Sequence, residues 1–215
     1  MDFIRRKYTL GEEVFNAISH GTGALLSIVG TVVLIVFCAV YADSRAVATA
    51  SIYGACLILL YTMSTLYHAI SNEKAKKVFR ILDHNTIFLM IAGTYTPYTI
   101  SCLNSKFGWI LFGCIWGSAV IGIVLSSINL KKFSKISTLC YLIMGWAVIF
   151  AIKPLYETIS TLSLILLLAG GLFYSIGIIF YVKRELRYMH SVWHLFVIGG
   201  SIMHYFSIFL ALVKV

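Results

Sequence analysis

The sequence predicts an all-α membrane protein, a bundle of seven transmembrane helices that forms a single domain over residues 1–215. Of its residues, 60% are hydrophobic and only 12% are charged, whereas soluble domains carry about 25% charged residues. A soluble chain of this length could not cover so much apolar surface. The charged residues are also clustered, and the clusters separate long apolar runs.

Seven runs lack Asp, Glu, Lys and Arg, and each is at least 17 residues long. A helix needs roughly 17–25 residues to cross the hydrocarbon core of a bilayer. Because lipid offers the backbone no hydrogen-bond partners, each run is expected to be a helix. Pro97, late in the third run, is expected to kink its helix, and Pro154 is expected in an outer loop. The runs are 14–42, 46–72, 84–105, 107–130, 136–152, 158–182 and 188–213.

The orientation of the bundle follows from the distribution of Lys and Arg, which accumulate on the cytoplasmic side. One set of run ends carries 13 positive residues and the other carries 4, and the two sets alternate along the chain. The N-terminus is therefore predicted to be cytoplasmic and the C-terminus outside. The net charge of +9 is then a topology signal and an attraction to anionic lipid, and it does not indicate nucleic-acid binding. The 13 are Arg5, Arg6, Lys7, Lys74, Lys76, Lys77, Arg80, Lys131, Lys132, Lys135, Lys183, Arg184 and Arg187; the 4 are Arg45, Lys106, Lys153 and Lys214.

Histidines gather on one side of the predicted bundle. Five of the six fall at cytoplasmic ends of the apolar runs. Ionisable residues inside a membrane are costly, and by default they indicate a functional site. In chain order the six are His20, His68, His84, His190, His194 and His204.

Two pairs with i, i+4 spacing carry the candidate chemistry. His190 and His194 lie one turn apart on one helical face, a spacing that can hold a metal ion. Ser64 and His68 repeat this spacing near the same depth on a different helix. Each pair alone also fits two side chains at the membrane interface. Together they supply three imidazoles at one level, and three histidines with one water form the pattern of a catalytic zinc site.

Four further residues are candidates for the surroundings of such an ion. Asp83 opens the third run, where it is either a helix cap or a carboxylate that contacts the metal-bound water or a ligand histidine. Glu13, Asn16 and His20 share a helical face by their i, i+3, i+7 spacing. They either support the ligands, contact a lipid headgroup, or form the capped start of an amphipathic helix.

The two remaining histidines are expected outside the ion site. His84 follows an acidic neighbour and must point elsewhere on the helix, so it is expected at the membrane interface. His204 lies on the same stripe as His194 but about 15 Å deeper, at 1.5 Å per residue. It cannot reach the same ion, and a hydrogen bond inside the bundle is favoured over a position in the wall of a cavity.

Read in chain order, these residues resemble the hemolysin III proteins of bacteria, which belong with the progestin and adiponectin Q receptor family. The matching pattern is Glu13-x-x-Asn16-x-x-Ser19-His20, Ser64-x-x-x-His68, Asp83 and His190-x-x-x-His194. The resemblance covers essentially the whole chain. It implies a multi-pass protein of the bacterial plasma membrane. It also implies a Zn²⁺ ion held by His68, His190 and His194, with Ser64 and Asp83 close by. The long N-terminal region of the animal receptors has no counterpart here, so hormone recognition is not expected.

The first functional hypothesis is a zinc-dependent hydrolase of lipid-like amides or esters, because the wider superfamily includes alkaline ceramidases. Its partners would be membrane lipids and a lipid-like small-molecule substrate, with a role in membrane homeostasis. Zinc can lower the pKa of bound water to about 7. Asp83 would orient or deprotonate that water, and Ser64 would donate a hydrogen bond to the oxyanion.

Other functions stay open or are disfavoured. A non-enzymatic membrane sensor or regulator would use the same ligands for a structural zinc, and turnover on ceramide-like lipids would separate the two. A haemolytic pore-former should be water-soluble before insertion, which this chain cannot be. A retinal protein needs a lysine within a span, and a G-protein-coupled receptor would have its N-terminus outside. The sequence favours no particular oligomeric state.

Overall fold

The computed structural model describes residues 8–183 and 185–213, and within them the chain is helical, without strands. Seven stretches in this part are long and apolar enough to cross a membrane. The predicted all-α membrane bundle is therefore confirmed. The elements are α1 (Leu10–Tyr41), α2 (Ser44–Ala69), α3 (Glu73–Thr96) continued by η1 (Pro97–Leu103), α4 (Lys106–Ile128), α5 (Leu130–Trp146) continued by η2 (Ala147–Ala151) and α6 (Ile152–Thr158), α7 (Thr161–Val182) and α8 (Met189–Leu212).

Polar side chains define where most of the spans begin. At the start of six of them, within the described residues, an N-cap oxygen accepts a hydrogen bond from a backbone N–H of the first turn, which satisfies one donor that the helix leaves unpaired. These short polar caps separate the apolar runs and turn the chain back into the membrane. The six are Thr9, Asp43, Asn72, Ser105, Asn129 and Ser160.

The start of α8 is held differently. Tyr188 has a left-handed backbone (φ 61°) and gives no side-chain cap. Its N–H donates to Glu12 Oε1 at 2.8 Å, and the Glu12 side chain is buried. The same carboxylate accepts from the Thr9 N–H through Oε2. The first turn of α1 therefore fixes the first turn of α8, which brings their polar residues together.

The two prolines act at helix junctions. At Pro97 the third span changes from α-helix to the π-helix η1, because proline lacks an N–H and cannot continue the regular pattern. The expected disturbance is thus a change of helix type. The expectation for Pro154 is wrong, since this residue lies inside α6. It occupies the first turn of that helix, where the N–H would have no intrahelical partner.

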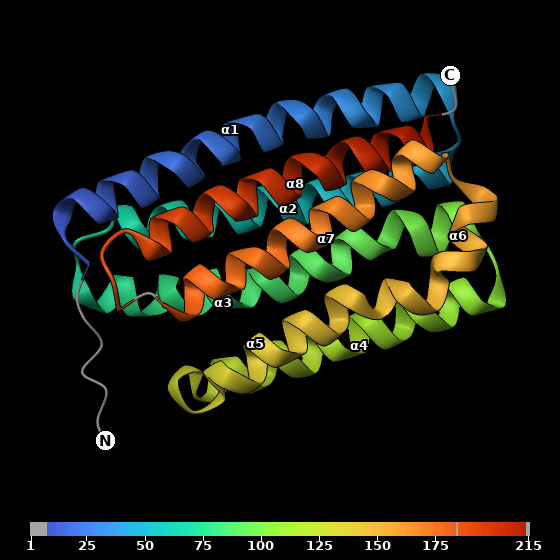
Figure 1. The fold of residues 1–215 in the computed structure, drawn as a ribbon. Helices are drawn as coiled ribbons and strands as arrows, with labels where there is room; N and C mark the ends of the chain where they lie inside the picture. Colours follow the sequence, from blue (N-terminus) through green and yellow to red (C-terminus); the bar gives the residue numbers. More distant parts are fainter. Residues whose placement is uncertain (1–7, 184, 214–215) are drawn as a thin grey trace.

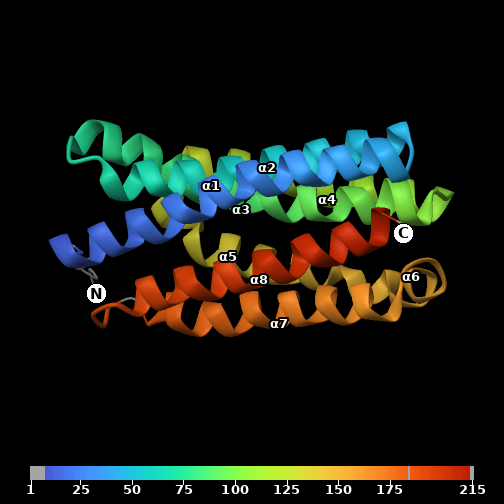
Figure 2. The ribbon, with the colours of Figure 1, turned by 90° about the horizontal axis from the view of Figure 1, so that it is seen from above.

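The spans lie side by side along one common axis, and the two ends of the chain lie at opposite ends of the bundle (Figures 1 and 2). Consecutive spans pack together, and α1 packs against α8, which closes the bundle. The third span is the most enclosed, because 67% of the residues in its apolar 18-residue stretch are buried. The corresponding share is 50% in the second span and 44% in the seventh. These three spans carry Asp83, His68 and His190, so the candidate site belongs to the interior.

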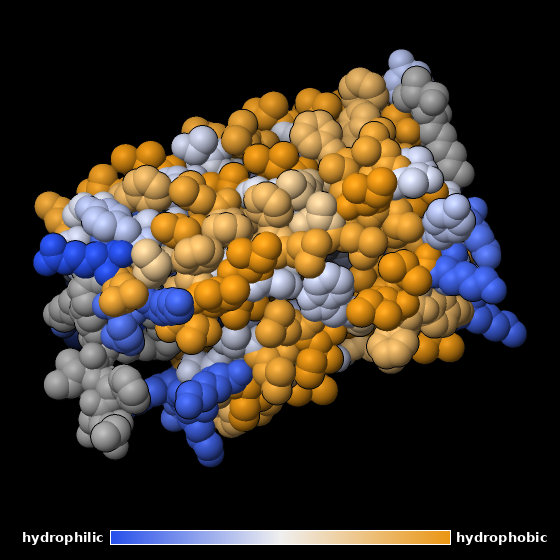
Figure 3. All heavy atoms as spheres, in the orientation of Figure 1, coloured by the Kyte–Doolittle hydropathy of each residue, from blue (hydrophilic) through white to orange (hydrophobic). Residues whose placement is uncertain are grey.

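The outer surface matches a lipid environment. Figure 3 shows apolar side chains along the flank of the bundle, while hydrophilic residues gather at its two ends. Large apolar residues such as Leu25, Val29 and Ile121 are more than half exposed. Such a band is what a multi-pass protein of the cell membrane presents to acyl chains.

Membrane orientation can be tested directly. Reporter fusions in the positively charged segments around Lys76, Lys132 and Arg184 are expected to give cytoplasmic signals, because such segments resist translocation. The structure places Lys76 in the first turn of α3 and Lys132 in the first turn of α5, and not in loops as the sequence suggests. The prediction depends on the positions of Lys and Arg, and five of these lie outside the described residues: Arg5, Arg6, Lys7, Arg184 and Lys214. Labelling of Lys132, at the start of α5, by an impermeant reagent from outside would contradict the orientation.

Candidate metal centre

Three histidines from two helices converge at one end of the bundle. His68 lies in the last turn of α2, and His190 and His194 lie in the first two turns of α8. Each offers one ring nitrogen, and these three nitrogens all lie within 4.8 Å of one another. All three side chains are buried. The trio, meaning His68, His190 and His194 from here on, is therefore a group that could hold a metal ion.

One pair of nitrogens in the trio has the spacing expected around a small tetrahedral ion. His190 Nε2 and His194 Nε2 lie 3.2 Å apart. Zinc–nitrogen distances of about 2.0–2.1 Å place two nitrogens of a tetrahedral site about 3.3 Å apart. His68 Nε2 is buried and has no hydrogen-bond partner among the described residues. A buried nitrogen of this kind costs about 1–3 kcal/mol unless something binds it, and an ion between the rings would do so.

Side chains of α1 hold the other edge of His68. Glu13 Oε2 lies 2.6 Å from His68 Nδ1, and Asn16 Nδ2 lies 3.5 Å from the same nitrogen. Nδ1 therefore carries the proton that the carboxylate accepts, and the lone pair of Nε2 is left free for a metal. Asn16 also accepts from Ser191 Oγ at 2.7 Å, which ties α1 to the histidine turn of α8. Of the alternatives for Glu13 and Asn16, the structure favours support of the histidines.

Glu13 is expected to tune the affinity for the ion. Glu13→Gln keeps the shape of the side chain and removes the charge that polarises His68. Loss of such an outer partner typically weakens metal binding 10–100-fold, and competition with a chelator of known affinity would measure it. The matched control is Lys76→Met, because Lys76 Nζ pairs with Glu13 Oε1 at 2.8 Å but does not contact the histidine. An unchanged affinity in Glu13→Gln would refute this role.

His20 lies against the trio without being part of it. Its ring stacks on the ring of His194, with centroids 3.6 Å apart and an interplanar angle of 15°. It is buried, and neither ring nitrogen has a hydrogen-bond partner among the described residues. Its ring also forms part of the wall of a cavity. His20 is therefore placed between a candidate ligand and the space that a bound molecule would fill.

Asp83 lies inside the third span and does not cap it. The cap interpretation is wrong, because α3 begins at Glu73 behind the N-cap Asn72. The charge-free run starts late because the lysines and the arginine of this segment sit on the helix itself. The Asp83 carboxylate is buried, lines the cavity, and lies within electrostatic reach of His68 and His190.

Ser64 is a buried hydroxyl one helical turn from His68 on α2. Its Oγ has no hydrogen-bond partner among the described residues. Neighbouring hydroxyls on the same helix, such as Thr65, bond back to the backbone of the preceding turn. A hydroxyl that makes no such bond is available to a bound molecule or water.

Of the two histidines expected outside the ion site, His84 differs from the expectation and His204 agrees with it. His84 is buried: its Nδ1 lies 2.9 Å from the Arg80 carbonyl oxygen and 3.5 Å from Asp83 Oδ2. The interface interpretation is wrong because α3 extends a further three turns beyond this point toward the membrane surface. His204 hydrogen-bonds inside the bundle as expected, with Nε2 3.0 Å from the Leu167 carbonyl oxygen, and it also lines the cavity.

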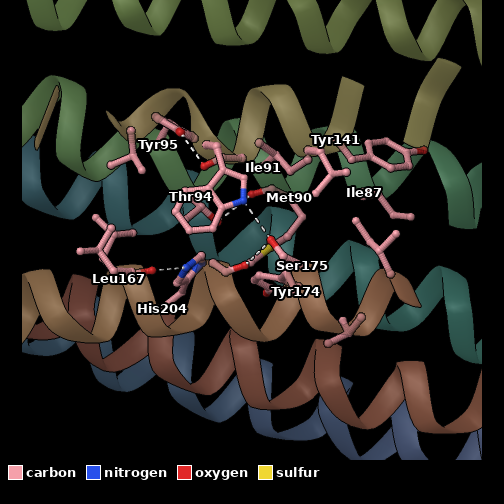
Figure 4. A pocket seen from close by; sticks show the side chains of 18 of the residues that line it. Ile87, Met90, Ile91, Thr94, Tyr95, Tyr141, Leu167, Tyr174, Ser175 and His204 are labelled. Carbon is pink, nitrogen blue, oxygen red and sulfur yellow. Dashed lines mark hydrogen bonds between the residues drawn. The ribbon is translucent and has the colours of Figure 1, made fainter. Parts of the chain in front are cut away.

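A cavity of about 150 Å³ leads away from this cluster into the bundle. It runs from His20 and Asp83 at one end toward Leu103 and Leu155 at the other, and most of its wall is apolar. Figure 4 shows side chains of α3, among them Met90, facing residues of α7 and α8 across this space. An apolar cavity that ends at a few convergent polar groups is suited to an alkyl chain with a polar head.

Some contacts of the cluster are not predicted by the spacing of residues along the sequence. The Tyr8 ring stacks on His190 with centroids 5.0 Å apart. Ser191 bonds to Asn16, and Lys76, counted there only as a topology signal, pairs with Glu13. These residues are far apart along the chain, so spacing could not connect them. The one local signal was that Ser191 directly follows His190, which places it near the histidine cluster.

Fold and site together define a seven-helix membrane protein with a buried three-histidine cluster beside an apolar cavity. The family model described as "Haemolysin-III related" matches residues 8–205, so the chain belongs to the haemolysin III family. "Hemolysin-3" of Bacillus cereus is 47% identical over 197 residues, which cover 92% of this chain and 90% of the relative. "Hemolysin-3 homolog" of Bacillus subtilis is 42% identical over 208 residues, covering 97% and 98%.

A more distant animal relative extends the comparison. "Monocyte to macrophage differentiation factor" of Homo sapiens is 28% identical over 214 residues, which cover 95% of this chain and 86% of the relative. The match covers most of the length of both chains. The predicted resemblance to hemolysin III is confirmed, and this relative agrees with the wider receptor family named with it.

Proposed function

We propose that this protein is a zinc-dependent hydrolase of lipid-like amides or esters that acts at the cytoplasmic side of the membrane. The observation that carries the proposal is the meeting of two features at one point. The trio offers converging nitrogens, and Asp83 lies both within electrostatic reach of His68 and His190 and in the wall of an apolar cavity. The proposed metal centre and the proposed alkyl-chain site thus meet at Asp83.

The donor set agrees with zinc. Imidazole nitrogens suit zinc among the biological metals, and three protein ligands leave a position open, as in catalytic sites. When bound, zinc supplies a Lewis acid that activates water and polarises a carbonyl. In this proposal His68, His190 and His194 hold the ion, and Glu13 fixes the tautomer of His68.

Asp83 and Ser64 are assigned to the reacting groups. The Asp83 carboxylate accepts a hydrogen bond from the attacking water and takes its proton. It then gives this proton to the leaving amine or alcohol as the C–N or C–O bond breaks and the fatty acid is released. The unpartnered Ser64 hydroxyl donates to the carbonyl oxygen as negative charge develops on it. The buried position of both groups strengthens these interactions, because water does not screen them.

The cavity would take the hydrocarbon part of the substrate. Its apolar wall replaces the lipid environment of an acyl chain, while the scissile amide or ester lies at the end near His20 and Asp83. The substrate is thus drawn from the membrane itself, which fits a role in maintaining membrane composition.

A turnover assay tests the proposal. Purified protein with its zinc measured is incubated with an N-acyl sphingoid lipid and with a matched acyl ester, and released fatty acid is quantified. Release is expected to stop on chelation and to return when zinc is added back. A fully zinc-loaded protein that releases no fatty acid from either lipid would contradict the hydrolase and favour the non-enzymatic sensor.

A further inference from the structure

His204 is a polar residue of the cavity wall far from the metal centre. It lies ten residues beyond His194 on α8, which corresponds to about 15 Å along the helix. The side chain is 8% exposed and lines the same cavity as His20 and Asp83. It appears among the labelled cavity residues in Figure 4, next to Leu167 and Tyr174. Its position is therefore deep in the apolar part of the proposed lipid site.

The hydrogen bonds of His204 define which nitrogen is free. Nε2 lies 3.0 Å from the Leu167 carbonyl oxygen, so it must carry a proton and donate. No carboxylate among the described residues pairs with His204, and an uncompensated buried charge is expensive, so the ring is neutral. Nδ1 is then an acceptor, and it is buried without a hydrogen-bond partner in the described part of the chain.

Nearby polar groups of the cavity wall are already satisfied. Tyr174 Oη lies 2.7 Å from Ser201 Oγ, and Tyr98 Oη lies 2.6 Å from Ser207 Oγ. Ser175 donates to the Gly171 carbonyl oxygen at 2.8 Å. Tyr53 Oη is also buried without a partner in the described part of the chain, but Tyr53 does not line the cavity. Among the described residues of the cavity wall at this depth, His204 Nδ1 is thus the acceptor without a partner.

The place of the His204 ring is built by its neighbour on α7. A Cβ on Gly170 would lie 2.2 Å from His204 Cδ2 and 2.6 Å from Nε2, closer than real atoms approach. Glycine at this position lets the ring lie against the helix and reach the Leu167 carbonyl. The orientation of Nδ1 therefore depends on a residue that itself lacks a side chain.

We propose that His204 forms a second polar subsite, which binds a hydroxyl group on the hydrocarbon chain of a lipid through Nδ1. A hydroxyl on the chain suits this nitrogen, because Nδ1 can accept but not donate and a hydroxyl supplies a donor. The preferred ligand class is then a chain hydroxylated well away from its polar head. The inference rests on the proposed function only for the position of that head beside the trio.

A binding assay tests this without turnover. Displacement of a fluorescent fatty acid from the purified protein compares stearate, 12-hydroxystearate and 2-hydroxystearate. The 12-hydroxy chain is expected to bind about two- to tenfold more tightly than stearate, the net value of one hydrogen bond. The 2-hydroxy chain is expected to show no preference that depends on His204. The comparison is repeated with a chelator, so that an absent hydrolase activity and an absent hydroxyl preference are seen separately.

Three variants identify the residue responsible. His204→Phe and Gly170→Ala are both expected to bind stearate as before and to lose the preference for 12-hydroxystearate. Tyr98→Phe removes a cavity hydroxyl that is already partnered, and it is expected to keep the preference. Equal binding of stearate and 12-hydroxystearate by the unmodified protein, or a preference that survives His204→Phe, would overturn the subsite. The first result would mean that the chain hydroxyl does not bond to Nδ1, and the second that a group other than His204 binds it.

Discussion

If the trio holds zinc as proposed, replacing His190 and His194 together by Ala is expected to remove the metal from the purified protein. The two Nε2 atoms lie 3.2 Å apart, and without them His68 would be a single imidazole, which does not retain zinc against a chelator. The loss should exceed the 10–100-fold change that follows removal of an outer partner. Metal analysis of purified protein, with circular dichroism to confirm that the helices remain, measures it.

The matched control is His84→Ala. His84 is a buried histidine near the same end of the bundle, but its Nδ1 and Nε2 already contact the Arg80 carbonyl oxygen and the Tyr181 hydroxyl. This variant is expected to retain its zinc. Full zinc retention in the double variant would show that the trio does not hold the ion.

The spans and the trio could be predicted from sequence because each depends on a strong local rule. Lipid offers the backbone no hydrogen-bond partners, so a segment that crosses the membrane must be helical. Long runs without charged residues therefore mark the spans. The i, i+4 spacing of His190 and His194 puts both rings on one face whatever the packing. His68 joined them because alternating charge placed the end of α2 at the same level as the start of α8.

Contacts that depend on packing between helices could not be predicted in this way. Glu13 meets His68 across 55 positions of the chain, which requires the rotation of α1 about its own axis. The beginning of α3 was misjudged because Asp83 marks the end of the charged residues, whereas the helix begins at the cap Asn72. The cavity was also invisible, since it is enclosed by side chains of several helices.

The chemistry of Asp83 gives the sharpest remaining test. Asp83→Asn is expected to keep most of the zinc, because the trio and not the carboxylate supplies the ligands. It is expected to lose hydrolysis by roughly 10²–10⁴-fold, the usual contribution of a positioned acid or base. The substitution preserves shape and removes charge, and Asp83 is buried in the cavity wall. Zinc content and fatty acid release are measured on the same preparation.

Ser64→Ala tests the role at the carbonyl oxygen separately from the role of Asp83 at the attacking water. Because Ser64 Oγ has no partner among the described residues, its removal breaks no hydrogen bond of the fold, and zinc is expected to remain. Loss of one oxyanion donor typically lowers turnover about 10²–10³-fold. Thr65→Val is the control, since that hydroxyl bonds back to the Tyr61 carbonyl oxygen and is expected to leave turnover unchanged. If Asp83→Asn and Ser64→Ala both keep zinc and turnover, Asp83 only lines the cavity, Ser64 is only a buried hydroxyl of α2, and their catalytic assignment is wrong.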